Sequence, residues 1–493
     1  MKKILLFAFS LSLAVLPSCV KDSPTKNLPE DRRTTYYVNQ FAYNMMSVYY
    51  LWNKEISDGL AEWGLDDDPI AKVAELRYKD AQGKDIDRWS MVTDNIASLQ
   101  GQVTGNTKSM GFDFSLYYAG ETHENVIMVV NFTYAGSPAA EAGLKRGDTI
   151  IAIDGRLITP SNYISLLTSS VYGDGTSVFT MADNTDVTLT AKQMYLDPVN
   201  THKIIEANGK KYGYLLYTSF TLDSCADLEE VFGEFTAAGI DELILDLRYN
   251  PGGYLITSEV LASLIVPATE IMSRSIYLKE VYNSILADSW GEETSVFQPE
   301  YNVETSSGTR TVHTLSANPG VGKLHVIMTG GTASASESLV CGLAPYMPVS
   351  LVGEKSSGKF CAGFIVEGPT WYDWVRDEIG KSESNLGKKY TDNWGIYVMI
   401  SRYGDKNGET ACMPDGLTPN IEVTDNPLDG YELGDIRESM LSVIVGDKTA
   451  PANARHRSPL RPAPEKLENP SRRIPIAITS VPASAAMARD AVK

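Results

Sequence analysis

A serine and a lysine that lie 25 positions apart are the residues of this chain best suited to covalent chemistry. Ser334 belongs to Gly331-Thr-Ala-Ser-Ala-Ser-Glu337, and Lys359 ends Gly353-Glu-Lys-Ser-Ser-Gly-Lys359. A serine hydroxyl needs a base to become a good nucleophile, and none of the five histidines lies in a motif that resembles a Ser-His-Asp triad. A lysine can be that base when its pKa falls by about three units from about 10.4. The spacing therefore predicts a nucleophilic Ser334 activated by a buried Lys359.

The same residues allow other interpretations. Ser334-x-x-Glu337 is also the capping box that begins many helices. The segment 353–359 fits part of a phosphate-binding loop, but Phe360 stands where that loop needs Ser or Thr for magnesium. Ser356-x-x-Lys359 matches one motif of the penicillin-recognising enzymes, whose S-D-N and K-T-G motifs are missing from the sequence. Cys361 is a further candidate nucleophile, although a small core residue in a strand is its commoner role.

A third motif supplies a place for a developing negative charge. Asp246-Leu-Arg-Tyr-Asn-Pro-Gly252-Gly253 follows the strand-like residues 243–245. A Gly-Gly turn at the end of a strand leaves backbone N–H groups uncovered, which is what an oxyanion needs. The start of a helix at Ser334 adds the positive end of the helix dipole.

In this order, D-L-R-x-N-x-G-G, T-A-S-A-S-E and G-E-x-x-x-G-K resemble the motifs of the C-terminal-processing peptidases, the S41-type serine endopeptidases. The resemblance covers about residues 41–423. It implies that Ser334 is the nucleophile and Lys359 the general base. It also implies an oxyanion hole formed by the N–H groups of Ala335 and of Gly252 or Gly253.

One position departs from the family pattern. Many bacterial members have a glutamine four residues after the lysine, where it is thought to orient the amine, and this chain has Gly363 there. An inactive protease-like scaffold that binds peptides in the cell envelope is therefore the alternative function. A nucleotide hydrolase built on residues 353–359 is a third and weaker class. No metal-ligand cluster or internal repeat is evident, and we expect no cofactor.

A second module lies upstream. Gly136-Ser-Pro-Ala-Ala-Glu-Ala-Gly-Leu-Lys-Arg-Gly-Asp-Thr-Ile-Ile-Ala-Ile-Asp-Gly155 resembles a PDZ domain. A short helix that begins at proline, glycine stops and an alternating strand agree with that resemblance. The preceding segment, Met110-Gly111-Phe112-Asp113-Phe114, is predicted to grip a peptide's C-terminal carboxylate through backbone N–H groups, although an ordinary hairpin is the simpler alternative. We therefore expect substrates that are proteins or peptides with free C-termini.

Composition and the first residues indicate a secreted protein. The chain has 493 residues, 43% of them hydrophobic, and a net charge of −19, which argues against nucleic acid as a partner. Residues 1–19 combine a basic start with a short apolar core, as a secretory signal does. Leu16-Pro-Ser-Cys19 resembles a lipobox, and plain signal cleavage nearby is the alternative. A lipidated Cys19 would anchor the protein in a bacterial cell envelope, at the outer membrane or in the periplasm. We expect the other four cysteines to be free buried thiols.

The elements that must position these motifs alternate between strand and helix. The predicted strands are residues 212–220, 243–247, 324–329 and 349–352, and the predicted helices are 226–238, 255–265 and 334–344. Such alternation predicts a parallel sheet with crossover helices, with the three motifs at the carboxyl ends of strands. Residues 34–100 have an aromatic stripe at near-helical spacing, and residues 369–393 are expected to be a polar, aromatic-tipped loop that forms an active-site wall or a surface excursion.

The chain is therefore predicted to be a multidomain α/β protein. It comprises a lipoprotein signal peptide (1–19), an N-terminal linker and helical region (20–102), a PDZ-like β-rich domain (103–195), an S41-like peptidase domain (196–445) and a disordered tail (446–493). The family resemblance implies a crotonase/ClpP-like α/β protease core with crossover helices.

Overall fold

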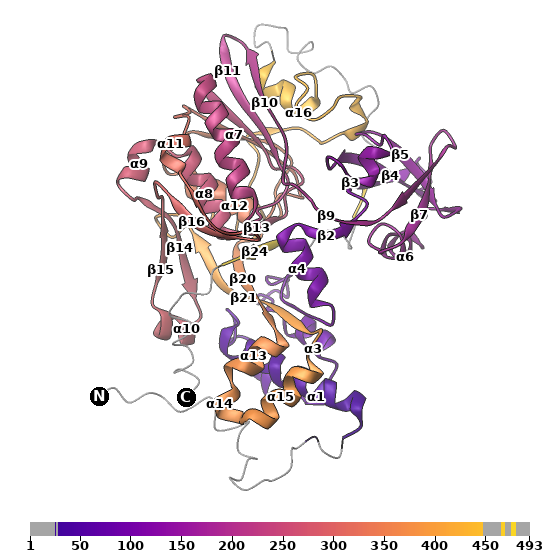
Figure 1. The fold of residues 1–493 in the computed structure, drawn as a ribbon, viewed down its shortest axis with the longest axis vertical. Coiled ribbons are helices and arrows are strands. Elements are labelled where there is room, and N and C mark those ends of the chain that lie inside the picture. Colours follow the sequence, from indigo (N-terminus) through magenta and orange to yellow (C-terminus); the bar gives the residue numbers. More distant parts are fainter. Residues whose placement is uncertain (1–24, 26–27, 447–464, 469–474, 480–493) are drawn as a thin grey trace.

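The computed structural model describes residues 25, 28–446, 465–468 and 475–479. Cys19, the predicted lipidation residue, lies outside the described residues. Within them, no helix is long and apolar enough to span a membrane. Figure 1 shows three regions, which are an α/β core, a β-rich module on one side of it, and a helical region below both.

The core is built on a six-stranded sheet with the order β10-β11-β12-β18-β19-β22. The first pair is antiparallel and the other neighbours are parallel, as the alternation of strands and helices predicts. The strands are β10 (Val199–Ala207), β11 (Lys210–Tyr217), β12 (Glu242–Asp246), β18 (Leu324–Met328), β19 (Val349–Gly353) and β22 (Ile421–Glu422). The helices between them are α7 (Ser224–Ala238), α8 (Leu255–Ile265) and α12 (Ala335–Leu343). All residues of β18 are buried, as expected for a strand covered on both faces.

A second sheet packs next to the catalytic motifs. Its order is β13-β24-β20-β21-β14-β15, and β1 also pairs with β21. The strands are β13 (Gly252–Tyr254), β24 (Ile476–Ile478), β20 (Cys361–Glu367), β21 (Gly395–Gly404), β14 (Ile276–Tyr282), β15 (Glu293–Val296) and β1 (Met91–Thr93). In Figure 1, β24 lies beside β13 and β20 near the middle of the molecule.

The β-rich module forms a third sheet, ordered β23-β3-β4-β5-β7-β8, with β6 paired to β5. Its elements are β23 (Lys466–Leu467), β3 (Phe112–Ala119), β4 (Asn125–Thr133), α5 (Pro138–Glu141), β5 (Thr149–Ile153), β6 (Arg156–Leu157), α6 (Tyr163–Ser169), β7 (Thr176–Met181) and β8 (Asp186–Thr190). The module has a hydrophobic cluster of its own. The strands β2 (Asn106–Ser109) and β9 (Lys192–Tyr195) pair where the chain enters and leaves it.

The prediction of a disordered tail is wrong for two short segments, residues 465–468 and 475–479. Each contributes a strand to a sheet, β23 and β24 respectively. The reason is apolar burial. Leu467 packs against the cluster of the β-rich module, and Ile478 packs against the main core.

The helical region contains α1 (Glu30–Asn44), a π-helical turn (Met45–Tyr49), α2 (Ser57–Ala61), α3 (Pro69–Leu76) and α4 (Ile96–Thr104). The prediction of a loop at residues 369–393 is wrong, because this stretch forms α13 (Gly368–Trp374), α14 (Arg376–Ile379) and α15 (Lys381–Tyr390). Its aromatic side chains are buried against α1. The rings of Tyr37 and Tyr390 stack at 5.5 Å, and Phe41 lies 5.8 Å from Trp371.

The remaining elements flank the core. They are the hairpin β16 (Tyr301–Thr305) and β17 (Gly308–Val312), the helices α9 (Ala268–Met272), α10 (Ser284–Trp290), α11 (Thr314–Ala317) and α16 (Ser439–Val445), and a 3-10 turn at Pro427–Asp429.

Candidate active site

Ser334 lies at the turn between β18 and α12. Its φ of 65° and ψ of −117° are rare for a residue with a side chain, and such strain is typical of nucleophiles placed at a sharp strand-to-helix turn. The side chain is fully buried, and its Oγ has no hydrogen-bond partner among the described residues. Both neighbouring serines are engaged, since Ser336 Oγ donates to the Asn250 carbonyl (3.1 Å) and Ser338 Oγ to the Ala335 carbonyl (2.9 Å). Ser334 is therefore the serine of this motif with a hydroxyl available for chemistry.

Glu337 ties the serine motif to the lysine motif. One oxygen of its buried carboxylate, Oε2, accepts from the N–H groups of both Ser334 and Lys359, each at 2.8 Å. The other oxygen, Oε1, accepts from Ser356 Oγ (2.5 Å) and from the Gly358 N–H (2.7 Å). Burial raises the pKa of Glu337 to about 7, although these four donors oppose the rise. The S-x-x-E pattern predicts Glu337 as a helix cap, but it does not predict these contacts with the lysine motif.

Lys359 is fully buried beside aromatic rings. Its Nζ donates to Tyr397 Oη (2.6 Å) and to the Pro475 carbonyl (2.9 Å), and it lies 5.3 Å from the centroid of the Trp89 ring. Burial lowers its pKa to about 8. A substantial fraction of neutral amine is therefore present at mildly alkaline pH, as a general base requires.

Tyr397 stands next to the lysine amine although the family pattern predicts a glutamine at position 363. A Cβ atom at Gly363 would lie 2.3 Å from the Val398 carbonyl oxygen, so a glutamine does not fit there without a backbone shift. Tyr397 comes from β21, the strand that pairs with β20. No local motif marks it, because an aromatic residue in a buried strand is indistinguishable from ordinary core in a sequence.

The predicted oxyanion residues line the same region. The Ala335 N–H opens α12, where the first N–H groups have no intrahelical acceptor. The Gly252 N–H donates to Asn250 Oδ1 (2.9 Å). On one side of β13, the Gly252 carbonyl accepts from the Phe220 N–H, and the Tyr254 N–H donates to the Phe220 carbonyl. The N–H of Gly253, between them, therefore faces the other side of the strand, where β24 pairs. The geometry therefore favours Ala335 and Gly253 over Gly252 as donors to an oxyanion.

Most N–H groups of the loop 353–359 are bonded within the protein. The N–H groups of Glu354, Ser356 and Ser357 donate to backbone carbonyls, and those of Gly358 and Lys359 donate to Glu337. These bonds argue against a nucleotide-binding role for this loop.

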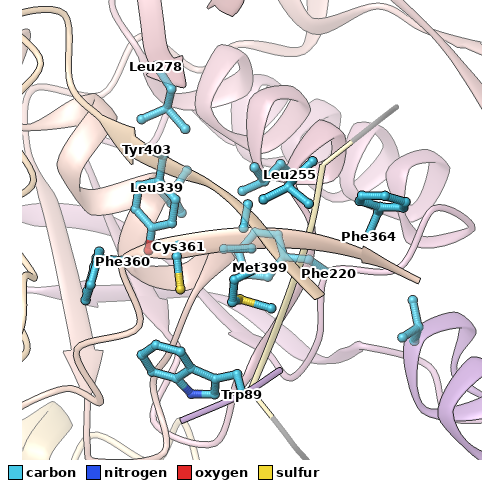
Figure 2. Packing of buried hydrophobic residues seen from close by; sticks show 14 of the residues in the cluster. Trp89, Phe220, Leu255, Leu278, Leu339, Phe360, Cys361, Phe364, Met399 and Tyr403 are labelled. Atoms are coloured by element: carbon cyan, nitrogen blue, oxygen red, sulfur yellow. The ribbon is translucent and has the colours of Figure 1, made fainter. Parts of the chain in front are cut away.

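Cys361 lies in the hydrophobic core, and burial raises the pKa of its thiol well above the ordinary range. Figure 2 shows it in the core cluster that also contains Phe360, Leu339 and Tyr403. All four described cysteines are free and buried, as expected. A nucleophilic role for Cys361 has no support in these surroundings.

The predicted peptide-binding residues 110–114 lead into β3. Gly111 has a φ of 76°, and its N–H donates to Ser109 Oγ (2.9 Å). Met110, Phe112 and Phe114 are buried in the cluster of the β-rich module. Asp113 Oδ1 accepts from Asn131 Nδ2 (2.6 Å). A carboxylate bound at this loop would replace the Ser109 hydroxyl as the acceptor for Gly111.

A buried ionic cluster joins the β-rich module to the core. Asp425 accepts from Arg146 Nη2 (2.9 Å), Arg248 Nη1 (3.0 Å) and Tyr249 Oη (2.5 Å). Burial alone would raise the pKa of Asp425, but the Arg146 and Arg248 guanidinium groups hold it well below its usual range. Arg248 also binds Asp246 and Glu438. The cluster holds the strand end that carries the Gly-Gly turn.

We expect Asp425→Ala to lower the free energy of unfolding by about 3–5 kcal/mol, because it leaves two buried guanidinium groups with one partner fewer. Urea unfolding followed by circular dichroism measures this loss. The matched control is Asp415→Ala, which removes an ion pair with Lys84 whose side chains are 59% and 50% exposed. That change should cost less than about 1 kcal/mol. Equal losses in the two variants would contradict a structural role for the cluster.

Comparisons with known proteins show which families the chain resembles. Residues 211–423 match the model of peptidase family S41, and residues 124–172 match the model of the PDZ domain. A carboxyl-terminal-processing protease of Synechocystis sp. (strain ATCC 27184 / PCC 6803 / Kazusa) is 29% identical over 275 residues, which cover 53% of this chain and 55% of the relative. The carboxy-terminal processing protease CtpB of Bacillus subtilis (strain 168) is 24% identical over 286 residues, which cover 53% of this chain and 54% of the relative. The chain thus spans about half the length of the curated relatives it matches.

The fold also has a counterpart among solved structures. The crystal structure of an S41 protease from Bacteroides fragilis NCTC 9343 superposes with a TM-score of 0.62 at 22% identity, covering 82% of this chain and 96% of that one. Residues 211–423 are thus similar to the serine peptidases of family S41, a hydrolase family, and residues 124–172 are similar to PDZ domains. Within that class the chain is similar to the carboxyl-terminal-processing proteases.

Proposed function

We propose that this protein is a serine endopeptidase of the C-terminal-processing type. It would hydrolyse peptide bonds of proteins whose C-termini its PDZ domain captures. One observation carries the proposal. The unpartnered hydroxyl of Ser334 and the buried, weakly basic amine of Lys359 belong to segments that a single Glu337 carboxylate oxygen holds side by side.

The chemistry would use a Ser-Lys dyad. Neutral Lys359 takes the Ser334 proton as Oγ attacks the peptide carbonyl, and the negative charge that forms on the carbonyl oxygen is bound by the N–H groups of Ala335 and Gly253. Collapse of this intermediate breaks the C–N bond, and the protonated lysine gives its proton to the leaving amine. Lys359 then takes a proton from water as the water attacks the acyl-enzyme; collapse of this second intermediate breaks the bond to Ser334 Oγ and releases the acid, and Lys359 returns the proton to Oγ.

Tyr397 is proposed to orient the lysine amine in place of the family's glutamine. Tyr397→Phe removes the hydroxyl that lies 2.6 Å from Nζ, and we expect kcat to fall by up to about 100-fold, as small misplacements of catalytic groups do. Steady-state kinetics of peptide cleavage over a range of pH would measure this fall and the accompanying change in the apparent pKa. The control is Tyr372→Phe, whose buried hydroxyl donates to the Tyr37 carbonyl outside the site and whose kcat should be unchanged. Equal kcat values for Tyr397→Phe and the unmodified protein would remove this role.

The PDZ domain is proposed to bind free C-termini at residues 110–114. A terminal carboxylate makes charge-assisted hydrogen bonds that amidation weakens, and one such bond contributes about 1.5–3 kcal/mol. We therefore expect Ser334→Ala protein to bind a free-acid peptide at least about tenfold more tightly than its amidated form. Fluorescence titration of labelled peptides measures both affinities. Equal affinities would exclude carboxylate capture and leave the module a structural or regulatory role.

We also propose that the protein is lipid-anchored at Cys19 in a bacterial cell envelope, at the outer membrane or in the periplasm. The basic start of the chain and the lipobox-like Leu16–Cys19 sequence support this location.

A further inference from the structure

Residues 465–468 add a strand to the edge of the PDZ sheet. Lys466 and Leu467 pair antiparallel with Tyr117 and Leu116 of β3, and the Tyr118 N–H donates to the Glu465 carbonyl (2.9 Å). On the other side, Tyr163 Oη of α6 donates to the Glu468 carbonyl (3.4 Å). Leu467 packs against the PDZ core. Extended backbone paired with a sheet edge, with a side chain in an apolar pocket, is the mode in which PDZ domains bind peptides.

Residues 475–479 occupy the catalytic region in the same extended form. Ile476, Ala477 and Ile478 pair in parallel with Gly252, Gly253 and Tyr254 of β13. On the other side of β24, Ile478 pairs with Gly363 of β20 and the Thr479 N–H donates to the Gly363 carbonyl (3.1 Å). Thr479 Oγ1 also donates to Glu280 Oε1 (2.9 Å). The segment therefore fills the slot between β13 and β20, against the Gly253 N–H that faces it.

The dyad is not coupled while the segment is bound. Lys359 Nζ donates to the Pro475 carbonyl and to Tyr397, and Ser334 Oγ has no partner among the described residues. Ser334 and Lys359 both have 0% relative exposure. A substrate carbonyl cannot reach a fully buried Oγ, and a lysine bonded to Pro475 is not the base of Ser334.

We propose that residues 465–468 and 475–479 are an internal competitor of substrate, in which the first segment occupies the edge of β3 in the PDZ sheet, the second occupies the slot between β13 and β20, and Ser334 is thereby uncoupled from Lys359. This inference rests on the proposed function for its catalytic part. A bound substrate would follow the same course, as an extended peptide that pairs antiparallel with β3 and runs parallel to β13. Because both segments belong to one chain, binding of the second segment is intramolecular once the first is bound, so modest contacts at each site are enough to keep both occupied.

The test weakens each contact in the full-length chain. Leu467→Asp places a charge against the hydrophobic cluster of the PDZ domain, and Thr479→Pro removes the N–H that bonds Gly363. Leu157→Asp is the matched control, because Leu157 is a 58% exposed leucine on β6 of the same domain, away from β3. A labelled peptide with the sequence of residues 465–479 is titrated into each variant in the Ser334→Ala background, and cleavage of a quenched peptide is measured with Ser334 present.

If the segment fills both sites in nine of ten molecules, the double variant should bind the labelled peptide about tenfold more tightly and cleave about tenfold faster, and the control should change neither. Unchanged binding in Leu467→Asp, Thr479→Pro and the double variant would overturn the inference, whatever the cleavage rate. If the variants bind the labelled peptide more tightly but cleave at the same measurable rate as the unmodified protein, the segment does not inhibit cleavage. Tighter binding with no cleavage by any variant would support the segment as the occupant and contradict the peptidase proposal instead.

Discussion

Ser334→Ala protein is expected to lose peptide cleavage by about 10⁴-fold or more while it remains folded, because nucleophile removal leaves only the binding and oxyanion contributions. Its Oγ donates no hydrogen bond among the described residues, so its loss leaves no buried acceptor unsatisfied. A fluorogenic peptide assay measures the loss, and circular dichroism checks the fold.

The matched control is Ser336→Ala in the same motif. Its hydroxyl donates to the Asn250 carbonyl, so we expect a small loss of stability and turnover within about tenfold of the unmodified protein. If Ser336→Ala alone is inactive and Ser334→Ala turns over normally, the assignment of the nucleophile is wrong. If neither the unmodified protein nor any variant cleaves peptides, the alternative of a peptide-binding scaffold replaces the peptidase.

Lys359→Arg should reduce kcat by about 10²–10⁴-fold, the usual contribution of a general base, since guanidinium stays charged. For the unmodified protein, kcat/KM should rise with pH through an apparent pKa of about 8, because burial lowers the pKa of Lys359 to that value and the neutral amine is the active form. Cleavage rates measured from pH 6 to 10 give this profile. Normal turnover by the arginine variant, or a rate independent of pH, would remove Lys359 from the mechanism.

Sequence patterns predicted the parallel part of the core well. The helix predicted at 255–265 is α8, and the strand predicted at 349–352 is β19 with one residue more. Each of these elements is a buried apolar run of ordinary length that is bounded by residues typical of helix or strand ends. The local sequence preference and the tertiary packing therefore favour the same structure. The three motifs follow β12, β18 and β19, which are adjacent in the sheet.

What the sequence did not predict depends on long-range packing. Residues 369–393 look polar, yet their few aromatic side chains are buried against α1, which lies more than 300 residues earlier. The S-x-x-E spacing predicts the contact of Glu337 with the Ser334 N–H, but no local spacing encodes the contacts of Glu337 with residues 356–359 or of Tyr397 with Lys359. The strands β23 and β24 each have only two or three residues, which is too short for an alternating pattern to stand out from a proline-rich stretch.

The most direct test of the dyad is the rate at which a fluorophosphonate probe labels the protein, followed by mass spectrometry of the peptides. Thr479→Pro protein is used, because its slot should be open to the probe. We expect one phosphonylated residue, Ser334, with a labelling rate that rises with pH through about 8 and is lost in Lys359→Arg. Labelling of a different serine, or labelling of Ser334 at the same rate with arginine at position 359, would contradict a serine nucleophile activated by Lys359.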